Sequence, residues 1–288
     1  MMKIEYQLVT TDHLVDRLWF LDDEDYKAGM NGVAVTAYRT ETGILAFILM
    51  SNHVHFVLRG THENAEIFIN EYKRHYSAYL QRRYGFKEYL RRNDADIQEV
   101  RKEDESLERA VAYVQMNSVA ANICLHPTGY PWGTGNAFFK ATAVQGRKLG
   151  SLSIRSQMKL LQSKTLLPGY LLISDGYILP ESFVQVQYVE SLFRTPNRFN
   201  YFLVNSSKAK RLIANDTGIP AFRDQSIISA IPDLCHSLFR KTDLKELNWE
   251  QKAEIAKQLR KRFSSEIHQI ARITGISYQD IATMMDTI

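Results

Sequence analysis

Two neighbouring apolar runs stand out in the pattern of apolar and polar positions along this chain. Residues 43–50 read Gly-Ile-Leu-Ala-Phe-Ile-Leu-Met, and residues 53–59 read His-Val-His-Phe-Val-Leu-Arg after a Ser-Asn pair. Short apolar runs separated by a two-residue polar turn predict two consecutive strands. Side chains alternate between the faces of a strand, so His53 and His55 share one face while Val54 points into a core.

The same pattern predicts further elements on both sides of this hairpin. We expect a strand near residues 5–10, a helix that opens at the acidic residues 22–26, a helix over 64–84 and a helix over 105–119. Strands mixed with helices predict an α+β fold. We divide the chain into a first domain (1–135), a middle region of unknown role (136–241) and a helical C-terminal unit (242–288).

The pair of histidines is the strongest candidate for chemistry. Two imidazoles side by side on one strand face can hold a single cation. A bare His-x-His is more often a pair of ordinary strand histidines, so the flanking residues carry the interpretation. Residues 49–58, Leu-Met-Ser-Asn-His-Val-His-Phe-Val-Leu, closely resemble the HUH signature (His, bulky apolar residue, His) of single-tyrosine transposases. The phrases at residues 21–26 and 130–132 also resemble this family.

This resemblance requires a tyrosine, and the helix over residues 105–119 carries one. Tyr113 and Asn117 are four residues apart and so lie on one helical face. In the REP-associated branch of these transposases, such a helix carries the nucleophilic tyrosine, followed by an asparagine that completes the metal site. The family phrase is Tyr-x-x-x-Asn-Pro-Val-Arg-Ala-Gly, and here Ser118, Ala120 and Asn122 replace its Pro, Arg and Gly. The plain alternative for Tyr113 is a half-buried helix tyrosine.

The resemblance implies a ferredoxin-like HUH endonuclease domain, an antiparallel sheet with helices on one face. It also implies a site in which His53, His55 and Asn117 hold a divalent metal and Tyr113 is catalytic. Imidazole and amide ligands without thiolate suit Mn²⁺ or Mg²⁺ better than structural zinc. The cation would polarise a phosphodiester, and the tyrosine would attack it to form a covalent phosphotyrosine.

Charge is mildly basic, with 36 Lys and Arg against 32 Asp and Glu and a formal net charge of +4. A polyanion would therefore meet local basic patches rather than a global field. One such patch interleaves basic residues with tyrosines between residues 72 and 92, and its alternative is a solvated helix whose aromatic side chains pack inward. The DNA-binding candidates in this patch are Lys73, Arg74, Arg82, Arg83, Lys87, Arg91 and Arg92.

The C-terminal unit has helix-turn-helix character. Gly275 can end one helix in a left-handed conformation, and Ser277 can cap the next with Asp280 three residues on. The second helix, residues 278–285, contains no Lys or Arg, so base reading through arginine is excluded there. An ordinary helical hairpin is the alternative to a DNA-binding accessory.

Two cysteines, Cys124 and Cys235, provide neither a disulfide framework nor a zinc cluster, and a cytoplasmic location is the simple expectation. The N-terminal residues do not begin a signal peptide, and no apolar run reaches the ~18–20 residues that span a bilayer, so no membrane association is expected.

Three functions compete. The favoured one is a metal-dependent transposase-like endonuclease that cleaves and rejoins single-stranded DNA, with hairpin or palindromic elements as partners, acting as a monomer or homodimer. The second is a non-catalytic DNA-binding regulator derived from a transposase. The third is a replication-initiator or relaxase-type HUH nuclease, which commonly arranges its histidines and tyrosines differently. The absence of a Gly-rich phosphate loop or a Ser-His-Asp pattern disfavours small-molecule hydrolysis.

Overall fold

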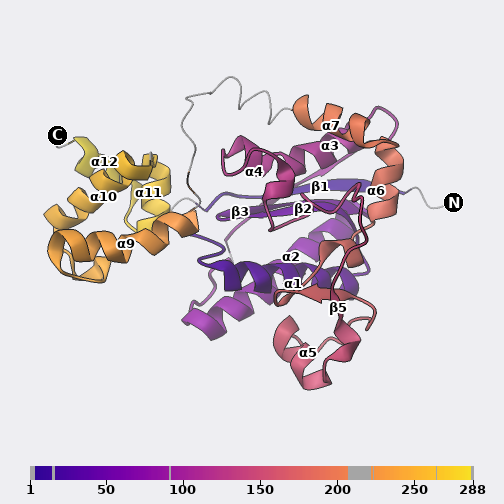
Figure 1. Ribbon diagram of the computed structural model, residues 1–288, viewed down its shortest axis with the longest axis horizontal. Coiled ribbons are helices and arrows are strands. Elements are labelled where there is room, and N and C mark those ends of the chain that lie inside the picture. Colours follow the sequence, from indigo (N-terminus) through magenta and orange to yellow (C-terminus); the bar gives the residue numbers. More distant parts are fainter. Residues whose placement is uncertain are drawn as a thin grey trace.

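The computed structural model describes residues 4–14, 17–90, 92–206, 222, 224–263 and 265–286. Within them, buried apolar side chains form a large core from Tyr6 to Leu203 and a separate core from Ile227 to Met285. The second core belongs to a lobe of helices beyond one end of the main sheet (Figure 1). No helix of the described ranges is both long enough and apolar enough to cross a bilayer.

The described chain alternates strands and helices in its first part and is helical in its last. The strands are β1 Tyr6–Thr11, β2 Gly43–Met50, β3 His53–Arg59, β4 Ala95–Glu99, β5 Arg147–Lys148, β6 Leu172–Ser174 and β7 Tyr177–Ile178. The α-helices are α1 Asp23–Arg39, α2 His62–Tyr84, α3 Ser106–Gln115, α4 Asn117–Ala120, α5 Ile154–Leu161, α6 Val186–Phe193, α7 Pro196–Val204, α9 Asp224–Phe239, α10 Trp249–Phe263, α11 Ile267–Thr274 and α12 Tyr278–Asp286. Short 3₁₀ turns occupy Pro127–Gly129, Leu149–Ser151, Pro180–Ser182 and Leu244–Glu246.

The main sheet is antiparallel, and its four strands lie in the order β2-β3-β1-β4. Along the chain the elements of this part follow the order β-α-β-β-α-β. A small antiparallel sheet, β5-β6-β7, lies beside α1 and is followed by α6 and α7. The fold is therefore of the mixed α+β class, with antiparallel sheets.

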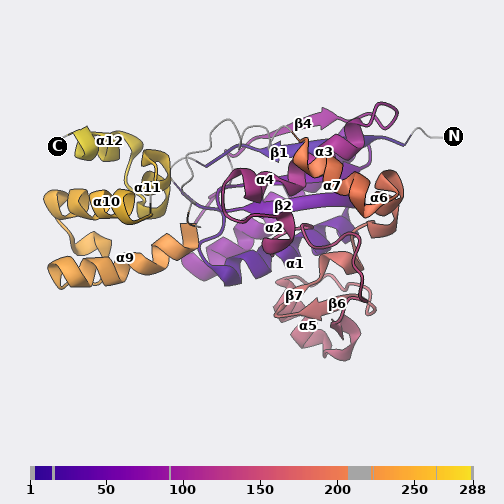
Figure 2. The same cartoon turned by 45° about the horizontal axis from the view of Figure 1, so that its top comes forward.

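The two central apolar runs form β2 and β3 with the predicted bounds. Residues 44–50 and 53–58 are all buried, so both faces of this hairpin are covered. On one face, Phe56 packs against Phe68 and Tyr72 of α2, with α1 alongside. On the other face lies α3, which the expectation of helices on one face did not include (Figure 2). The reason is that an antiparallel hairpin apolar on both sides must be covered on both sides.

The outer edge of β2 is covered by the segment around Trp132. The Leu49 N–H donates to the Trp132 carbonyl at 2.9 Å, and the Tyr130 hydroxyl donates to the Leu49 carbonyl at 2.7 Å. Gly133 lies so close that a Cβ there would meet the Phe47 carbonyl oxygen at 2.5 Å. The edge of the hairpin therefore has its main-chain groups paired rather than exposed.

The C-terminal lobe is joined to the sheet by a buried carboxylate. Asp224, at the first turn of α9, accepts from Arg272 Nε at 2.9 Å, from Gln269 Nε2 at 2.8 Å and from Ser51 Oγ at 2.5 Å. Ser51 belongs to the turn between β2 and β3, so this lobe is attached beside the histidine-bearing strand. Within the lobe, Gly275 has φ 68° between α11 and α12.

A second polar cluster ties α1 to the end of α2. The Asp25 carboxylate is fully buried and accepts from Arg83 Nη1 at 2.5 Å and from the Tyr79 hydroxyl at 2.8 Å. Arg83 also donates to both carboxylate oxygens of Asp22, at 2.6 and 2.7 Å. Burial raises the pKa of the Asp25 carboxyl above its ordinary value. The guanidinium therefore acts as a structural partner of two carboxylates.

We predict that Arg83→Ala lowers the free energy of unfolding by about 2 kcal/mol, because it leaves the buried Asp25 carboxylate without its cation. Arg82→Ala is the matched control, since the Arg82 side chain is exposed and donates to the neutral side chain of Gln162. Urea unfolding of both variants checks this. If the two variants were equally stable, the ion pair between Arg83 and Asp25 would contribute nothing to the free energy of unfolding.

Candidate functional site

Three aromatic rings meet on the α3 side of the sheet. The ring centroids of His53 and His55 are 4.8 Å apart with an interplanar angle of 86°, so the two imidazoles do lie side by side. The Tyr113 ring packs edge-on to His55, with centroids 5.6 Å apart. His53 is 6% exposed and His55 is 1% exposed, whereas Tyr113 is half-buried. The structure thus brings the predicted histidine pair and the predicted tyrosine into one cluster.

Asn52 sets the orientation of His53. Its amide Nδ2 donates to the Leu14 carbonyl at 3.0 Å, and this places Oδ1 towards the ring, 2.9 Å from His53 Nδ1. An amide oxygen can only accept, so a hydrogen bond here requires the proton of His53 to be on Nδ1. The buried Nε2 atom then has the lone pair and is the ring nitrogen suited to bind a cation.

His55 is held in a related way from the neighbouring strand. Thr10 pairs with His55 in the β1–β3 register, and Thr10 Oγ1 lies 2.9 Å from His55 Nδ1. The Nε2 atom of His55 is buried as well. Both rings are therefore fixed through Nδ1, which is the arrangement that presents Nε2 of a histidine to a metal.

A further histidine, which sequence reasoning did not single out, lies over the pair. The His13 ring stacks on His53 with centroids 3.7 Å apart and an interplanar angle of 15°. His13 follows the end of β1 and is itself exposed. Its separation from His53 in the sequence leaves no local signal, because only the pairing of β1 with β3 brings the two together.

The helix that carries Tyr113 ends earlier than predicted. α3 stops at Gln115, and Met116 separates it from the short α4, so Tyr113 and Asn117 do not share one unbroken helix. The amide Nδ2 of Asn117 donates to the Tyr113 carbonyl at 2.9 Å and to the Val114 carbonyl at 3.3 Å. The side chain of Asn117 thus satisfies carbonyls at the end of α3, where helices leave acceptors without main-chain partners.

One departure from the family phrase has a simple conformational basis. Asn122 stands where the phrase has Gly, and its φ is 55°. Asn adopts the left-handed region more readily than other residues with a side chain. The turn after α4 is therefore compatible with Asn122, while nothing in the structure explains Ala120 in place of Arg.

Several residues of the predicted basic patch have partners within the protein, and DNA binding by the patch stays a prediction. Lys73 Nζ donates to the Asn93 carbonyl at 2.7 Å, and Arg74 pairs with Glu71 at 2.6 Å. Arg83 is held by the carboxylates of Asp22 and Asp25. Tyr72 and Tyr76 are fully buried, which matches the alternative of aromatic side chains packed inward. Lys87 and Arg92 are exposed, and Arg91 lies outside the described residues.

The metal ligation by His53, His55 and Asn117 stays a prediction. Within the described ranges, no group of three or more His, Cys, Asp or Glu side chains is arranged to hold a metal ion.

We predict that His53 is protonated on Nδ1 at neutral pH, because its partner there is an acceptor. Long-range ¹H–¹⁵N spectra of protein labelled on histidine, with the signal assigned through His53→Gln, measure the tautomer. Asn52→Ala should shift this signal towards a tautomer mixture, whereas Asn64→Ala, at the start of α2, should leave it unchanged. An Nε2–H tautomer in the unmodified protein would contradict the assignment.

Comparison with known proteins adds little to this geometry. No family model matches the chain, and no curated protein matches it. Among solved structures, it is similar to one described as the REP-associated tyrosine transposase bound to a REP hairpin, with 12% sequence identity. The match covers 45% of this chain and 76% of that chain at a TM-score of 0.35, which is too low to assign a shared fold.

Proposed function

We propose that this chain is a metal-dependent endonuclease of the single-tyrosine HUH transposase type, which cleaves and rejoins single-stranded DNA. One observation carries the proposal. The His-x-His pair and Tyr113, which come from segments 58 residues apart in the sequence (113 − 55 = 58), meet on one face of the sheet with His55 and Tyr113 5.6 Å apart. This is the juxtaposition that the motif resemblance requires.

The arrangement of the main sheet supports the finer assignment of the fold. A β-α-β-β-α-β chain with the strand order β2-β3-β1-β4 is the split β-α-β arrangement of ferredoxin-like folds. We assign it to the HUH class because its central strand β3 carries the two histidines. The helices α3 and α4 on the histidine face are then the part that supplies the nucleophile.

A divalent cation such as Mn²⁺ or Mg²⁺ fits the histidine pair in its donor chemistry. Each ring has its Nδ1 engaged and its Nε2 buried on the cluster. Asn117 Oδ1 is our proposed third donor, with its Nδ2 already bound to the Tyr113 carbonyl. A bound cation would act as a Lewis acid towards a phosphate oxygen.

The proposed reaction is a transesterification at phosphorus. The Tyr113 phenol oxygen bonds to phosphorus, the bond from phosphorus to the deoxyribose O3′ breaks, and the leaving O3′ takes up a proton to become a hydroxyl. A free phenol has a pKa of about 10, so Tyr113 must lose its proton during attack. A 3′-hydroxyl can reverse the step, which restores the phosphodiester and frees Tyr113.

A non-catalytic DNA-binding regulator is the second candidate. The edge-on packing of Tyr113 against His55 and its half-buried state are also compatible with a tyrosine that only stabilises the helix. The two candidates differ in one observable, the covalent protein–DNA adduct.

We predict that the protein forms a covalent adduct with labelled single-stranded DNA in the presence of Mn²⁺ or Mg²⁺, and that Tyr113→Phe abolishes it because the attacking oxygen is gone. Denaturing gels measure the adduct, with hairpin-containing oligonucleotides included in the substrate pool. Tyr38→Phe is the matched control, since Tyr38 is 52% exposed and lies on α1. EDTA added before the DNA should prevent formation of the adduct.

Two results would overturn this proposal. An adduct that survives in Tyr113→Phe would exclude Tyr113 as the nucleophile. Clear binding of single-stranded DNA under native conditions without any adduct, across the substrate pool, would favour the non-catalytic regulator.

We predict that Asn117→Ala raises the Mn²⁺ concentration required for half-maximal adduct formation by at least about tenfold, in the range typical for weakened metal sites. It should also destabilise the fold by about 1 kcal/mol, because two carbonyls lose their donor. Gln115→Ala is the control for that structural loss, since Gln115 Nε2 donates to the buried Thr134 hydroxyl at 2.8 Å. Equal Mn²⁺ requirements in the two variants would leave Asn117 a purely structural role.

A further inference from the structure

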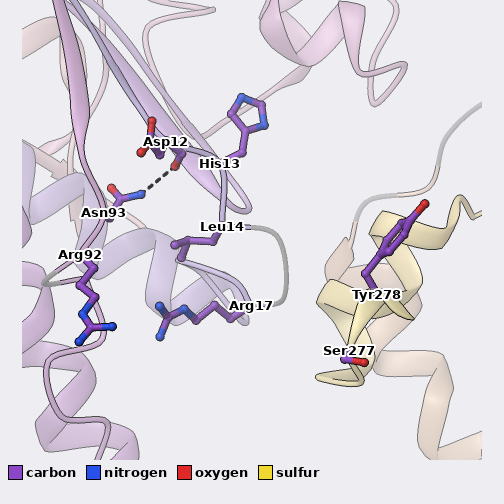
Figure 3. Close-up of a pocket in the computed structure, with 8 residues that line it drawn as sticks. All are labelled: Asp12, His13, Leu14, Arg17, Arg92, Asn93, Ser277 and Tyr278. Carbon is purple, nitrogen blue, oxygen red and sulfur yellow. Dashed lines mark hydrogen bonds between the residues drawn. The ribbon is translucent and has the colours of Figure 1, made fainter. Parts of the chain in front are cut away.

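A cavity lies between the main sheet and the C-terminal lobe. Its volume is about 430 Å³, within the ~300–1,000 Å³ of ordinary small-molecule sites. One wall comes from the segment after β1 and from the segment before β4, and the other comes from the start of α12 (Figure 3). The cavity therefore exists only because the two parts of the chain are attached to each other.

The wall on the sheet side is basic. Arg17 and Arg92 both line it, together with one carboxylate, Asp12. Lys73 lies behind this wall, where its Nζ donates to the Asn93 carbonyl and interacts with the charges of Asp94 and Asp12. Among the lining residues, the two guanidinium groups thus outnumber the one carboxylate. Such a wall favours an anionic group, and guanidinium is well matched to phosphate.

The wall on the lobe side is aromatic. The Tyr278 ring stacks on His268 with centroids 4.3 Å apart and an interplanar angle of 27°. The Tyr278 side chain is nevertheless 41% exposed, and it lies across the cavity from the two arginines (Figure 3). An exposed aromatic ring opposite a basic wall is the combination that single-strand binding proteins use, with phosphates on cations and bases stacked on rings.

The cavity is connected to the candidate active site through one residue. His13 lines it and stacks on His53, with centroids 3.7 Å apart. His13 thus belongs both to the lining of the cavity and to the histidine cluster. The hydrogen bond from Ser51 to Asp224 holds the lobe to the turn that precedes His53, so it keeps both walls in place.

We propose that this cavity binds one unpaired nucleotide of the DNA strand, its phosphate on Arg17 and Arg92 and its base on Tyr278. The identity of the ligand rests on the proposed function. The site selects single-stranded over double-stranded DNA, because only an unpaired base can enter between the walls and stack. The C-terminal lobe then contributes to substrate binding through a ring on α12, and the lack of Lys or Arg on that helix is no obstacle.

The test measures the affinity of the full chain for a fluorescein-labelled 20-nucleotide single strand by anisotropy, in EDTA so that no cleavage intervenes. We expect Arg92→Gln and Tyr278→Ala each to weaken binding about tenfold, and Tyr278→Phe to keep the affinity of the unmodified protein, since it retains the stacking ring. Arg155→Gln and Tyr201→Ala are matched controls, because both side chains are exposed and belong to other parts of the structure. These should bind as the unmodified protein does.

Photo-crosslinking supplies a second, independent measurement. Oligonucleotides with 5-iododeoxyuridine at successive positions should crosslink to Tyr278 from one position, as located by mass spectrometry. Unchanged affinity in both Arg92→Gln and Tyr278→Ala would overturn the proposal. So would an equal weakening by Tyr278→Ala of binding to a 20-base-pair duplex.

The adduct assay keeps this proposal distinct from the proposed function. If Tyr113 forms the adduct while the cavity variants bind normally, the cavity proposal fails alone. If the cavity variants lose affinity while no adduct forms, the cavity remains a single-strand binding site and the catalytic proposal fails.

Discussion

Burial of the β2–β3 hairpin on both faces is the constraint on which the rest of this structure depends. Every residue from Ile44 to Met50 and from His53 to Leu58 is buried, so each face must be covered by other elements. Helices α1 and α2 cover the face of Phe56, and α3 covers the opposite face. The histidines lie on the second face, and covering it brings Tyr113 to them. The candidate site therefore forms because both faces of the hairpin must be shielded from water.

The same burial explains why the two imidazoles need fixed partners. A buried polar ring must form hydrogen bonds, and here the partners differ in kind. Asn52 serves His53 from the adjacent position in the chain, and Thr10 serves His55 from the neighbouring strand. Both partners contact Nδ1, so the two rings present the same nitrogen. An arrangement of this type requires the turn before β3 and the register with β1 to be correct together.

Sequence reasoning predicted the parts of this molecule whose signal is local. The bounds of β2 and β3 follow from two uninterrupted apolar runs. The edge strand β4 was not predicted, because its sequence Ala-Asp-Ile-Gln-Glu gives no clear apolar run and all of its residues remain partly or fully exposed. Helix α9 was not predicted either, because it contains Pro232, which interrupts the helical pattern. The roles of Thr10 and His13 depend on strand pairing, and no spacing along the chain reveals them.

Only a few hydrogen bonds lie between the C-terminal lobe and His53. Ser51 donates to the buried Asp224, and the next residue in the chain, Asn52, orients His53. Arg272 of α11 holds the same carboxylate from within the lobe, so the lobe and the turn share one charged centre. A buried carboxylate is destabilised by the loss of any of its donors. Detachment of the lobe would leave Asp224 without Ser51, whereas the main-chain carbonyls of Ser51 and Asn52 would keep their donors, Trp19 and Leu14. The lobe is therefore attached directly beside the candidate site, while the orientation of His53 is set by groups outside the lobe.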